Sequence, residues 1–276
     1  IIFYHKLRMT AINYPQELPV SAFRAEILSA VRNNQVVIVS GDTGSGKTTQ
    51  LPKMMLELGR AAKGKRIAVT QPRRLAAVTM AERVATELGA TPGGLVGYRH
   101  RYQKAISSET RIEFLTDGVL LNETKFDPLL RAYDTIIVDE AHERSLNVDF
   151  LLGILRRILE KRRDLKVIVA SATMDTLRFA EFFDAPIIEI PGRLFPINIR
   201  YRPAEDDEDA ELPQQIAAAI QELPNEGDIL VFLSGERDIR EASEYLISVF
   251  GDRFDIIALL ASLPAAEQKR AFTLSS

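Results

Sequence analysis

Nine consecutive residues combine three glycines with a lysine and hydroxyl side chains, in the order Gly41-Asp42-Thr43-Gly44-Ser45-Gly46-Lys47-Thr48-Thr49. They fit the phosphate-binding pattern G-x-x-x-x-G-K-[ST]. Glycines let the backbone curl until its N–H groups and the start of the next helix point at a phosphate. Lys47 is then expected to reach the β- and γ-phosphates of a nucleoside triphosphate, and the Thr48 hydroxyl to bind Mg²⁺. All nine residues are predicted nucleotide-binding residues.

The carboxylate pair Asp139-Glu140 is a second group able to do chemistry, and it directly follows the apolar run Ile136-Ile137-Val138. The end of a strand there would place Asp139 beside the phosphate turn, where it can hold Mg²⁺ directly or through water. Glu140 is the candidate general base that orients and activates the attacking water, and a second candidate metal ligand. Such a pair alone is weak evidence, because surface acids are common. Joined to the glycine-rich turn, it favours hydrolysis over nucleotide binding alone.

These groups need strands and helices to position them. The apolar, β-branched residues 35–40 predict a buried strand before the turn, and residues 48–58 predict the helix after it. Strands alternating with helices predict an α/β fold with a mostly parallel sheet covered on both faces. Further strands are predicted at 65–70, 110–115, 134–138, 166–170 and 187–190, and helices at 21–32 (with Ser21 as N-cap), 75–88 and 146–163.

The pattern changes after Arg202. Residues 203–211 are strongly acidic, which is typical of an exposed linker and would repel a phosphate backbone. A second series follows, with helices predicted at 214–223 and 236–250 and strands at 228–233 and 255–260. These residues are too few for a complete nucleotide-binding α/β domain. The predicted organisation is an N-terminal extension (1–20), a first domain (21–202), an acidic linker (203–211) and part of a second domain (212–276).

Composition narrows the class of protein. The 276 residues are 46% hydrophobic, which suffices for buried sheets. A net charge of −3 argues against a protein that binds nucleic acid through a generally positive surface, so any polyanion must be held in a local groove. No uncharged apolar stretch approaches the ~20 residues of a membrane span, and the first residues do not resemble a signal peptide. The absence of cysteine suits a reducing cytoplasm, the predicted location.

Several motifs together resemble one family. Asp139-Glu140-Ala141-His142 spells the motif that names the DEAH-box helicases of superfamily 2, and residues 14–21 look most like the bacterial HrpA branch of RNA helicases. The similarity extends over nearly the whole chain from about Tyr14. The other motifs of the family follow in the right order: Thr70-Gln71-Pro72-Arg73-Arg74, Thr116-Asp117-Gly118, Ser171-Ala172-Thr173 and Phe232-Leu233-Ser234-Gly235.

The resemblance implies a RecA-like P-loop domain followed by part of a second RecA-like domain. The implied activity is that of an ATP-dependent RNA helicase, moving 3′→5′ on single-stranded RNA, with DNA as an alternative polymer. ATP with Mg²⁺ is the implied cofactor. Arg83 and Phe272 match the arginine and phenylalanine between which the adenine stacks in the family, although Phe272 fits a core position nearly as well. Stacking uses a face that every base possesses, so other nucleoside triphosphates should also be accepted.

The family also has a groove for the backbone of single-stranded RNA. Arginine forks match phosphate oxygens, and the pair after Pro72 follows a strand, at the edge where open α/β sheets bind ligands. Without the family context, an arginine pair is more often solvated surface. In the family, the turn 97–101 also lines the groove. The predicted RNA-binding residues are Arg73, Arg74, Arg101, Thr116, Asp117, Ser234 and Gly235.

By the same resemblance, His142 and the Ser171-Ala172-Thr173 segment couple the phosphate site to the groove. A ring N–H and two hydroxyls at a sheet edge can relay a change in hydrogen bonding, although that segment taken alone is more typical of a helix cap. Lys47, Glu140 and His142 are the predicted catalytic residues. The remaining basic and imidazole side chains are expected to be exposed: His5, His100, Arg156-Arg157 and Lys161-Arg162-Arg163.

Two later motifs of the family, including the one that supplies arginine fingers to the γ-phosphate, do not occur before Ser276. Such fingers contribute about 10³–10⁵ in rate in related phosphoryl transfers. We therefore expect this chain alone to bind nucleotide but to hydrolyse it slowly. Robust RNA-stimulated turnover by the purified chain would contradict this expectation.

Three alternative functions remain. Leu233-Ser234-Gly235-Glu236 resembles the signature of ABC-type transport ATPases, but there it precedes the carboxylate strand, whereas here it comes long after Asp139. A GTPase-like switch lacks support, because no Asn-Lys-x-Asp guanine-reading motif occurs. A nucleic-acid-binding scaffold with a vestigial ATPase is disfavoured by the intact Lys47, Asp139 and Glu140.

Overall fold

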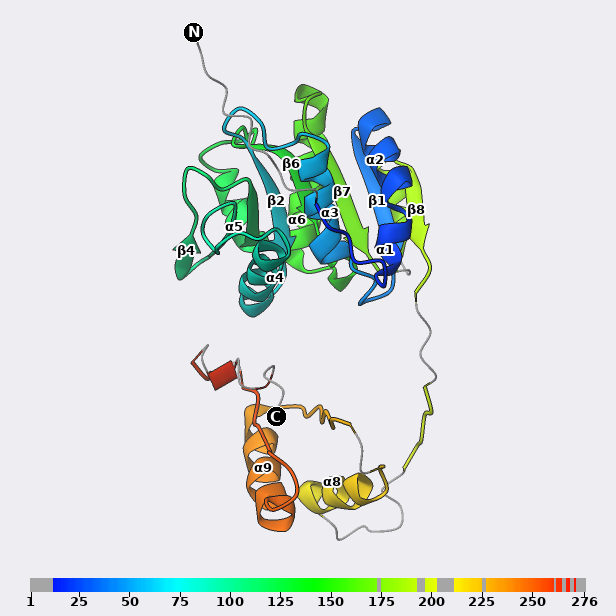
Figure 1. Ribbon diagram of the computed structural model, residues 1–276, viewed down its shortest axis with the longest axis vertical. Helices are drawn as coiled ribbons and strands as arrows, with labels where there is room; N and C mark the ends of the chain where they lie inside the picture. The colour runs from blue at the N-terminus through cyan, green and yellow to red at the C-terminus, as the bar shows by residue number, and fades with distance from the viewer. Residues whose placement is uncertain are drawn as a thin grey trace. The chain divides into compact units, whose positions relative to one another are not determined.

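The chain divides into two compact units, Ile1–Phe195 and Pro196–Ser276, each of which is described by itself (Figure 1). The computed structural model describes residues 12–172, 175–192, 197–202, 211–224, 227–260, 262–264, 267–268 and 271. The predicted linker at 203–211 lies almost entirely outside these residues, and the predicted domain boundaries stay predictions. Within the described part, no helix combines the length and the apolar character needed to span a bilayer.

The first unit is built on a sheet in which the described strands lie in the order β4-β3-β5-β2-β6-β7-β1-β8. Every neighbouring pair is parallel except β3 and β4, which form an antiparallel hairpin. This confirms the predicted mostly parallel sheet. The strands are β1 (Val36–Gly41), β2 (Arg66–Gln71), β3 (Val96–His100), β4 (Gln103–Ala105), β5 (Ile112–Thr116), β6 (Tyr133–Val138), β7 (Lys166–Ser171) and β8 (Ile187–Ile190).

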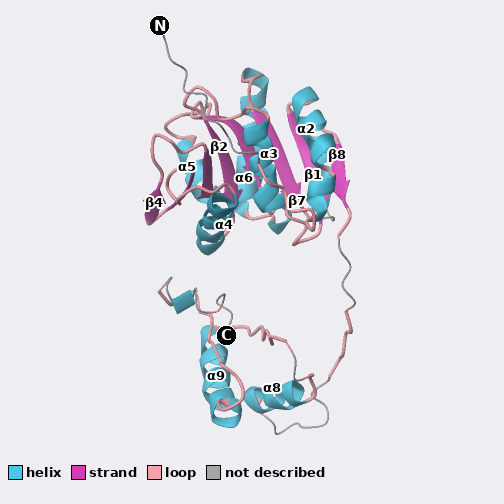
Figure 2. Ribbon diagram, in the orientation of Figure 1, coloured by secondary structure: helices cyan, strands magenta, loops and turns pink. Residues whose placement is uncertain are grey.

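Helices cover both faces of this sheet (Figure 2). One apolar cluster joins α2, α3 and α4 to one face, and a second joins α5, α6 and α7 to the other. Alternate residues of β1 enter the two clusters, which is why its sequence is continuously apolar. The helices of this unit are α1 (Pro19–Ala22), α2 (Arg24–Asn33), α3 (Lys47–Glu57), α4 (Arg74–Glu87), α5 (Asp117–Glu123), the 3₁₀ turn η1 (Ala141–Glu143), α6 (Leu146–Lys161) and α7 (Thr176–Phe183).

Two local predictions in this unit are wrong. Ser21 is not an N-cap, because it lies inside α1 and its hydroxyl donates to the Pro15 carbonyl at 2.6 Å. Residues 97–100 are not a turn, because they belong to β3 and pair with both β5 and β4. Gly97 belongs to the hairpin for a steric reason, since a Cβ there would lie 2.4 Å from the Ala105 carbonyl oxygen. The glycine therefore permits close strand approach rather than a chain reversal.

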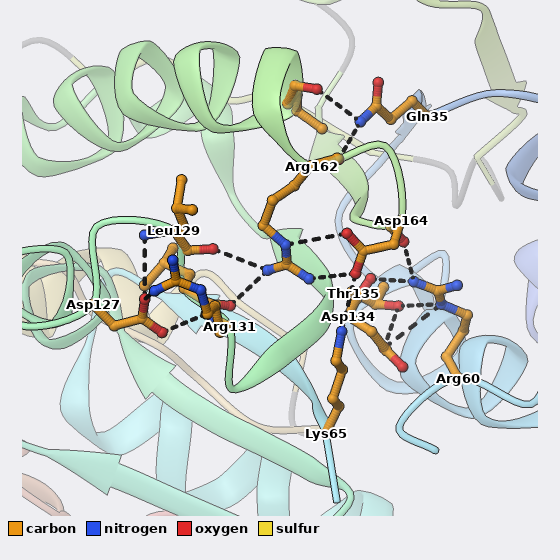
Figure 3. Close-up of polar contacts among 12 residues, drawn as sticks. Gln35, Arg60, Lys65, Asp127, Leu129, Arg131, Asp134, Thr135, Arg162 and Asp164 are labelled. Carbon is orange, nitrogen blue, oxygen red and sulfur yellow. Dashed lines mark hydrogen bonds and ion pairs between the residues drawn. The ribbon is translucent and has the colours of Figure 1, made fainter. Parts of the chain in front are cut away.

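An arginine–carboxylate network holds the edge where the strands begin (Figure 3). Arg162 Nη1 donates to the carbonyls of Leu129 at 2.9 Å and Leu130 at 2.8 Å, and Nη2 donates to Asp164 Oδ2 at 2.6 Å. Gln35 Nε2 donates to the Arg162 carbonyl at 2.6 Å. The expectation that Arg162 is solvated is wrong, because only 7% of its surface is exposed. Its two carbonyl acceptors come from a loop more than 30 residues away in sequence.

The second unit contains α8 (Leu212–Gln221) and α9 (Glu236–Phe250), which pack through Ala217, Leu246 and Phe250. The strands predicted at 228–233 and 255–260 are absent from the described residues, so both predictions are wrong. An extended segment becomes a strand only when its N–H and C=O groups pair with a neighbour. No strand pairing is found among the described residues of this unit, and Phe232 is 86% exposed.

Candidate nucleotide site and adjoining groove

The phosphate turn connects the end of β1 at Gly41 to the start of α3 at Lys47. Gly44 and Gly46 have φ values of 84° and 91°, in the left-handed region that glycine adopts without strain. A Cβ at Gly46 would also lie 3.0 Å from side-chain atoms of Leu18 and Val20. The glycine spacing is thus required by the conformation of the turn, as the motif predicts.

Lys47 is held inside the turn. Its Nζ donates to the Gly41 carbonyl at 2.6 Å, the Asp42 carbonyl at 3.0 Å and Ser45 Oγ at 3.2 Å. Burial lowers the pKa of Lys47, and the nearby carboxylates of Asp139, Glu140 and Asp42 oppose this shift. The Lys47 ammonium therefore donates to neutral oxygens of the turn, and these same N–H groups would donate to phosphate oxygens when a nucleotide binds.

Thr48 and Asp139 meet although they are 91 residues apart in sequence. Thr48 Oγ1 donates to Asp139 Oδ2 at 2.6 Å, and Gln71 Nε2 donates to the same oxygen at 2.6 Å. Asp139 is 1% exposed, and burial raises its pKa while these hydrogen bonds oppose the rise. One hydroxyl and one carboxylate are the oxygen donors that Mg²⁺ needs when phosphates and water complete its shell. The residues therefore fit a magnesium–nucleotide complex.

Glu140 and His142 follow Asp139 in a strained segment, in which Glu140 has a φ of 50°. Burial raises the pKa of Glu140, and the neighbouring Asp139 charge raises it further. His142 Nδ1 lies 3.5 Å from Glu140 Oε2 and accepts a hydrogen bond from the Ala172 N–H at 3.1 Å. In the contact with Ala172, Nδ1 acts as the hydrogen-bond acceptor. His142 thus contacts the end of β7, where Ser171 and Ala172 lie, while Thr173 is outside the described residues.

Beside this site lies a groove of about 400 Å³. It brings together all the predicted RNA-binding residues of the first unit, namely Arg73, Arg74, Arg101, Thr116 and Asp117. Glu143, Ser145 and Asn147 also line it, and sequence reasoning missed them. The only signal was their position just after the DEAH motif. Ser234 and Gly235 belong to the second unit, so their predicted role stays a prediction.

An exposed tyrosine lies at the tip of the β3–β4 hairpin. Tyr102 is 66% exposed, and the guanidinium carbons of Arg74 and Arg101 lie 4.5 Å and 5.6 Å from its ring centroid. Such cation–π contacts keep both guanidinium groups near one another despite their like charge. His100 is half-buried and stacks on Tyr98, so the expectation that it is exposed is wrong. His5 is outside the described residues.

The predicted adenine-binding pair is only partly described. Arg83 is exposed on α4, and its Nε donates to Glu87 Oε1 at 2.7 Å. Glu87 also accepts from Lys53 at 2.8 Å and Gln50 at 2.9 Å, which fixes it against α3. Phe272 is outside the described residues. The base-stacking role of both residues stays a prediction.

A hollow of about 420 Å³ lies beside the phosphate turn, lined by Ser40, Asp42 and the segment 189–192. It includes neither Lys47 nor Asp139. Among the residues that the structure describes, two carboxylates, Asp42 and Glu189, line it and no lysine or arginine does, which does not favour a phosphate. The candidate nucleotide site is therefore assigned by its side chains rather than by the size of a cavity.

The buried Asp117 carboxyl predicts a pH dependence of stability. Asp117 is 3% exposed; burial raises its pKa from 3.8 to about 6, and the charges of Glu143 and Asp139 contribute. Because the native pKa exceeds the unfolded one, the protein should lose about 2 kcal/mol of stability through this group as the pH rises from 4 to 7. Asp117→Asn should remove that part of the profile. Urea unfolding followed by circular dichroism measures it, and a variant effect that is equal at all pH values would contradict it.

This chain is similar in sequence to known helicases. The DEAD/DEAH box helicase family matches residues 21–180. The chain is 52% identical over 267 residues to the ATP-dependent RNA helicase HrpA of Escherichia coli K12, covering 95% of this chain and 20% of that protein. It is 49% identical to an HrpA homolog of Haemophilus influenzae with the same coverage. It is also 40% identical over 280 residues to a putative pre-mRNA-splicing factor ATP-dependent RNA helicase of Schizosaccharomyces pombe, covering 97% of this chain and 43% of that protein. The chain thus spans about a fifth of the two bacterial relatives.

Proposed function

The chain belongs to the DEAD/DEAH box helicase family, and we propose that it is the ATP-binding part of an ATP-dependent RNA helicase of DEAH type. The observation that carries this proposal is the 2.6 Å contact between Thr48 Oγ1 and Asp139 Oδ2, because it unites the phosphate turn with the carboxylate strand. The bacterial relatives, named as RNA helicases, support RNA as the polymer. Movement 3′→5′ along single-stranded RNA, in the cytoplasm, is part of the proposal.

In this proposal each residue has a separate task. Lys47 exchanges its carbonyl acceptors for β- and γ-phosphate oxygens, while the backbone N–H groups of the turn bind the same triphosphate. Thr48 and Asp139 would hold Mg²⁺, which would neutralise part of the charge on the phosphate oxygens. Glu140 orients the attacking water and accepts its proton, for which a raised pKa is suited.

The groove supplies the grip on RNA. Arg73, Arg74 and Arg101 present guanidinium groups to phosphates, which makes the grip largely independent of sequence and sensitive to salt. Because backbone phosphates are common to both polymers, DNA remains an alternative ligand. Alternation between tight and weak grip during the ATP cycle would convert hydrolysis into movement. The slow hydrolysis expected of this chain alone stays a prediction.

Two binding titrations on the purified chain test the proposal. A fluorescent ATP analogue should bind in the presence of Mg²⁺ and more weakly with EDTA, because Thr48 and Asp139 then have no cation to share with the phosphates. A fluorescein-labelled 12-nucleotide oligo(U) should bind with an affinity that falls as salt rises. A chain that binds RNA but no nucleotide would instead support the vestigial scaffold. A chain that binds neither would overturn the proposal.

Removing one groove arginine should weaken RNA binding uniformly. Arg101→Ala should lower the affinity for oligo(U) about 3- to 10-fold at 100 mM salt and reduce the slope of log K against log[salt] by about 0.7. Arg157→Ala, which removes an exposed arginine of α6, is the matched control and should change neither quantity. Fluorescence anisotropy measures both. Equal effects of the two variants would mean that the groove is not the binding surface.

A further inference from the structure

Gln71 lies between the candidate magnesium site and the groove. It is the last residue of β2 and is 3% exposed. Its Nε2 donates at 2.6 Å to Asp139 Oδ2, the oxygen that also accepts from Thr48 Oγ1. Asp139 is itself 1% exposed, so this carboxylate has little access to water. Any movement of the Asp139 carboxylate therefore changes its hydrogen bond with the Gln71 amide.

The backbone of Gln71 belongs to the other site. In the sheet register Gln71 pairs with Thr116, which lines the groove. The next residues along the chain, Pro72, Arg73 and Arg74, also line it. The side chain of Gln71 thus contacts Asp139, the candidate magnesium ligand. Its backbone is next to two groove residues, Pro72 along the chain and Thr116 on the neighbouring strand.

Nucleotide binding should change what Asp139 Oδ2 accepts. In the proposed function the Thr48 hydroxyl would hold Mg²⁺ and no longer donate to this oxygen, so that Gln71 Nε2 would be the remaining side-chain donor of the two observed on it. A shift of the carboxylate must then move the amide or break its hydrogen bond. Because the surrounding residues are tightly packed, movement of Gln71 is transmitted to the backbone that holds Arg73.

We propose that Gln71 is a positioning residue that couples nucleotide binding at Lys47 and Asp139 to the affinity of the groove for RNA. This inference rests on the proposed function. A purely structural role, in which the amide only satisfies a buried carboxylate, predicts lower stability without any change in coupling. The two roles are therefore distinguished by how much nucleotide changes the affinity for RNA. Neither the nucleotide affinity nor the RNA affinity distinguishes them by itself.

The test measures that linkage in the purified chain. Affinity for labelled oligo(U) is measured with and without a non-hydrolysable ATP analogue plus Mg²⁺, in wild type and in Gln71→Met, which keeps the length of the side chain but removes the donor. We expect the analogue to change RNA affinity at least about fivefold in wild type and less than twofold in the variant. By reciprocity, RNA must change the affinity for the analogue by the same factor.

Gln35→Met is the matched control. Gln35 Nε2 also donates two hydrogen bonds, to the carbonyls of Leu159 and Arg162, but at the opposite edge of the sheet (Figure 3). It should lose stability and keep the full linkage. If Gln71→Met does not fold, Gln71→Leu replaces it, since leucine is smaller than methionine's extended chain and also has no donor.

Full linkage in the Gln71 variant would overturn the inference, and so would wild type that binds both ligands without linkage. These results would leave the proposed function intact. Wild type that binds neither ligand would instead overturn the proposed function and the inference with it.

Discussion

Lys47→Ala should weaken the binding of ATP by about a hundredfold or more. The side chain is buried, and its ammonium now donates to two neutral carbonyls and one hydroxyl of the turn. Anionic phosphate oxygens are stronger acceptors, and each charge-assisted hydrogen bond contributes about 1.5–3 kcal/mol. Loss of two such bonds, near 3 kcal/mol, corresponds to about two orders of magnitude in affinity. Titration with a fluorescent ATP analogue in Mg²⁺ measures the change.

The control for this prediction is Lys161→Ala, which removes an exposed lysine at the end of α6. It should leave the affinity unchanged, so that a general effect of net charge is excluded. Circular dichroism of Lys47→Ala should match wild type, because the alanine leaves the carbonyls of Gly41 and Asp42 accessible to water. A loss of less than about threefold would mean that the glycine-rich turn is not where the triphosphate binds.

Much of the site was predictable from sequence, because its positions depend on local patterns. The continuous apolar run before Gly41 and the run before Asp139 each predict a buried strand, and parallel strands end at one edge of a sheet. The convergence of Thr48 and Asp139 follows from these two facts alone. Likewise, α9 spans Glu236–Phe250 as predicted, because its amphipathic pattern needs no distant partner to specify a helix.

The features that sequence reasoning missed depend on distant partners. Arg162 carries the same charge as its solvated neighbours, and only the Leu129 and Leu130 carbonyls make it a buried residue. Gln71 lies within a recognisable motif, but its contact with Asp139 joins residues 68 positions apart. The strands predicted in the second unit fail for the same reason, since their pattern is apolar but pairing is a property of neighbours. Local pattern therefore predicts which elements form, whereas packing decides which polar groups meet.

A charge cluster joins β2, β3, β5 and β6 to α5 through contacts between residues that are distant in sequence. Arg99 in β3 donates to Glu113 Oε1 at 2.7 Å and contacts Glu123 at the end of α5 at 2.5 Å. Arg66 lies 3.2 Å from Glu113 Oε2, and the Tyr133 hydroxyl lies within hydrogen-bonding distance of both carboxylates. Burial raises the pKa of Tyr133, so its proton is retained for these bonds. Two arginines and two glutamates thus neutralise one another.

Glu113→Ala should lower the free energy of unfolding by about 3–5 kcal/mol. Glu113 is fully buried, and its removal leaves Arg66 without the carboxylate that it contacts and Arg99 with Glu123 alone, so that positive charge is uncompensated. Breaking a buried ion pair from one side typically has an effect of this size. Glu113→Gln keeps the shape and some hydrogen bonds, and should lose less. Urea unfolding monitored by circular dichroism measures both changes, with the exposed Glu160→Ala as the control that should change stability by less than about 0.5 kcal/mol.

The same variant should weaken RNA binding more than nucleotide binding. Arg99 lies two residues before Arg101, and Glu123 ends the helix that Asp117 begins, so the cluster joins the two elements that present these groove residues. The phosphate turn follows β1, and β7 separates β1 from β6, the strand of Tyr133, in the sheet. At a temperature where Glu113→Ala remains folded, affinity for oligo(U) should therefore fall several-fold while affinity for the ATP analogue stays within twofold of wild type. A loss of stability below 1 kcal/mol would mean that Glu123 alone compensates Arg99 and Arg66, and the cluster would then not be what holds the hairpin against α5.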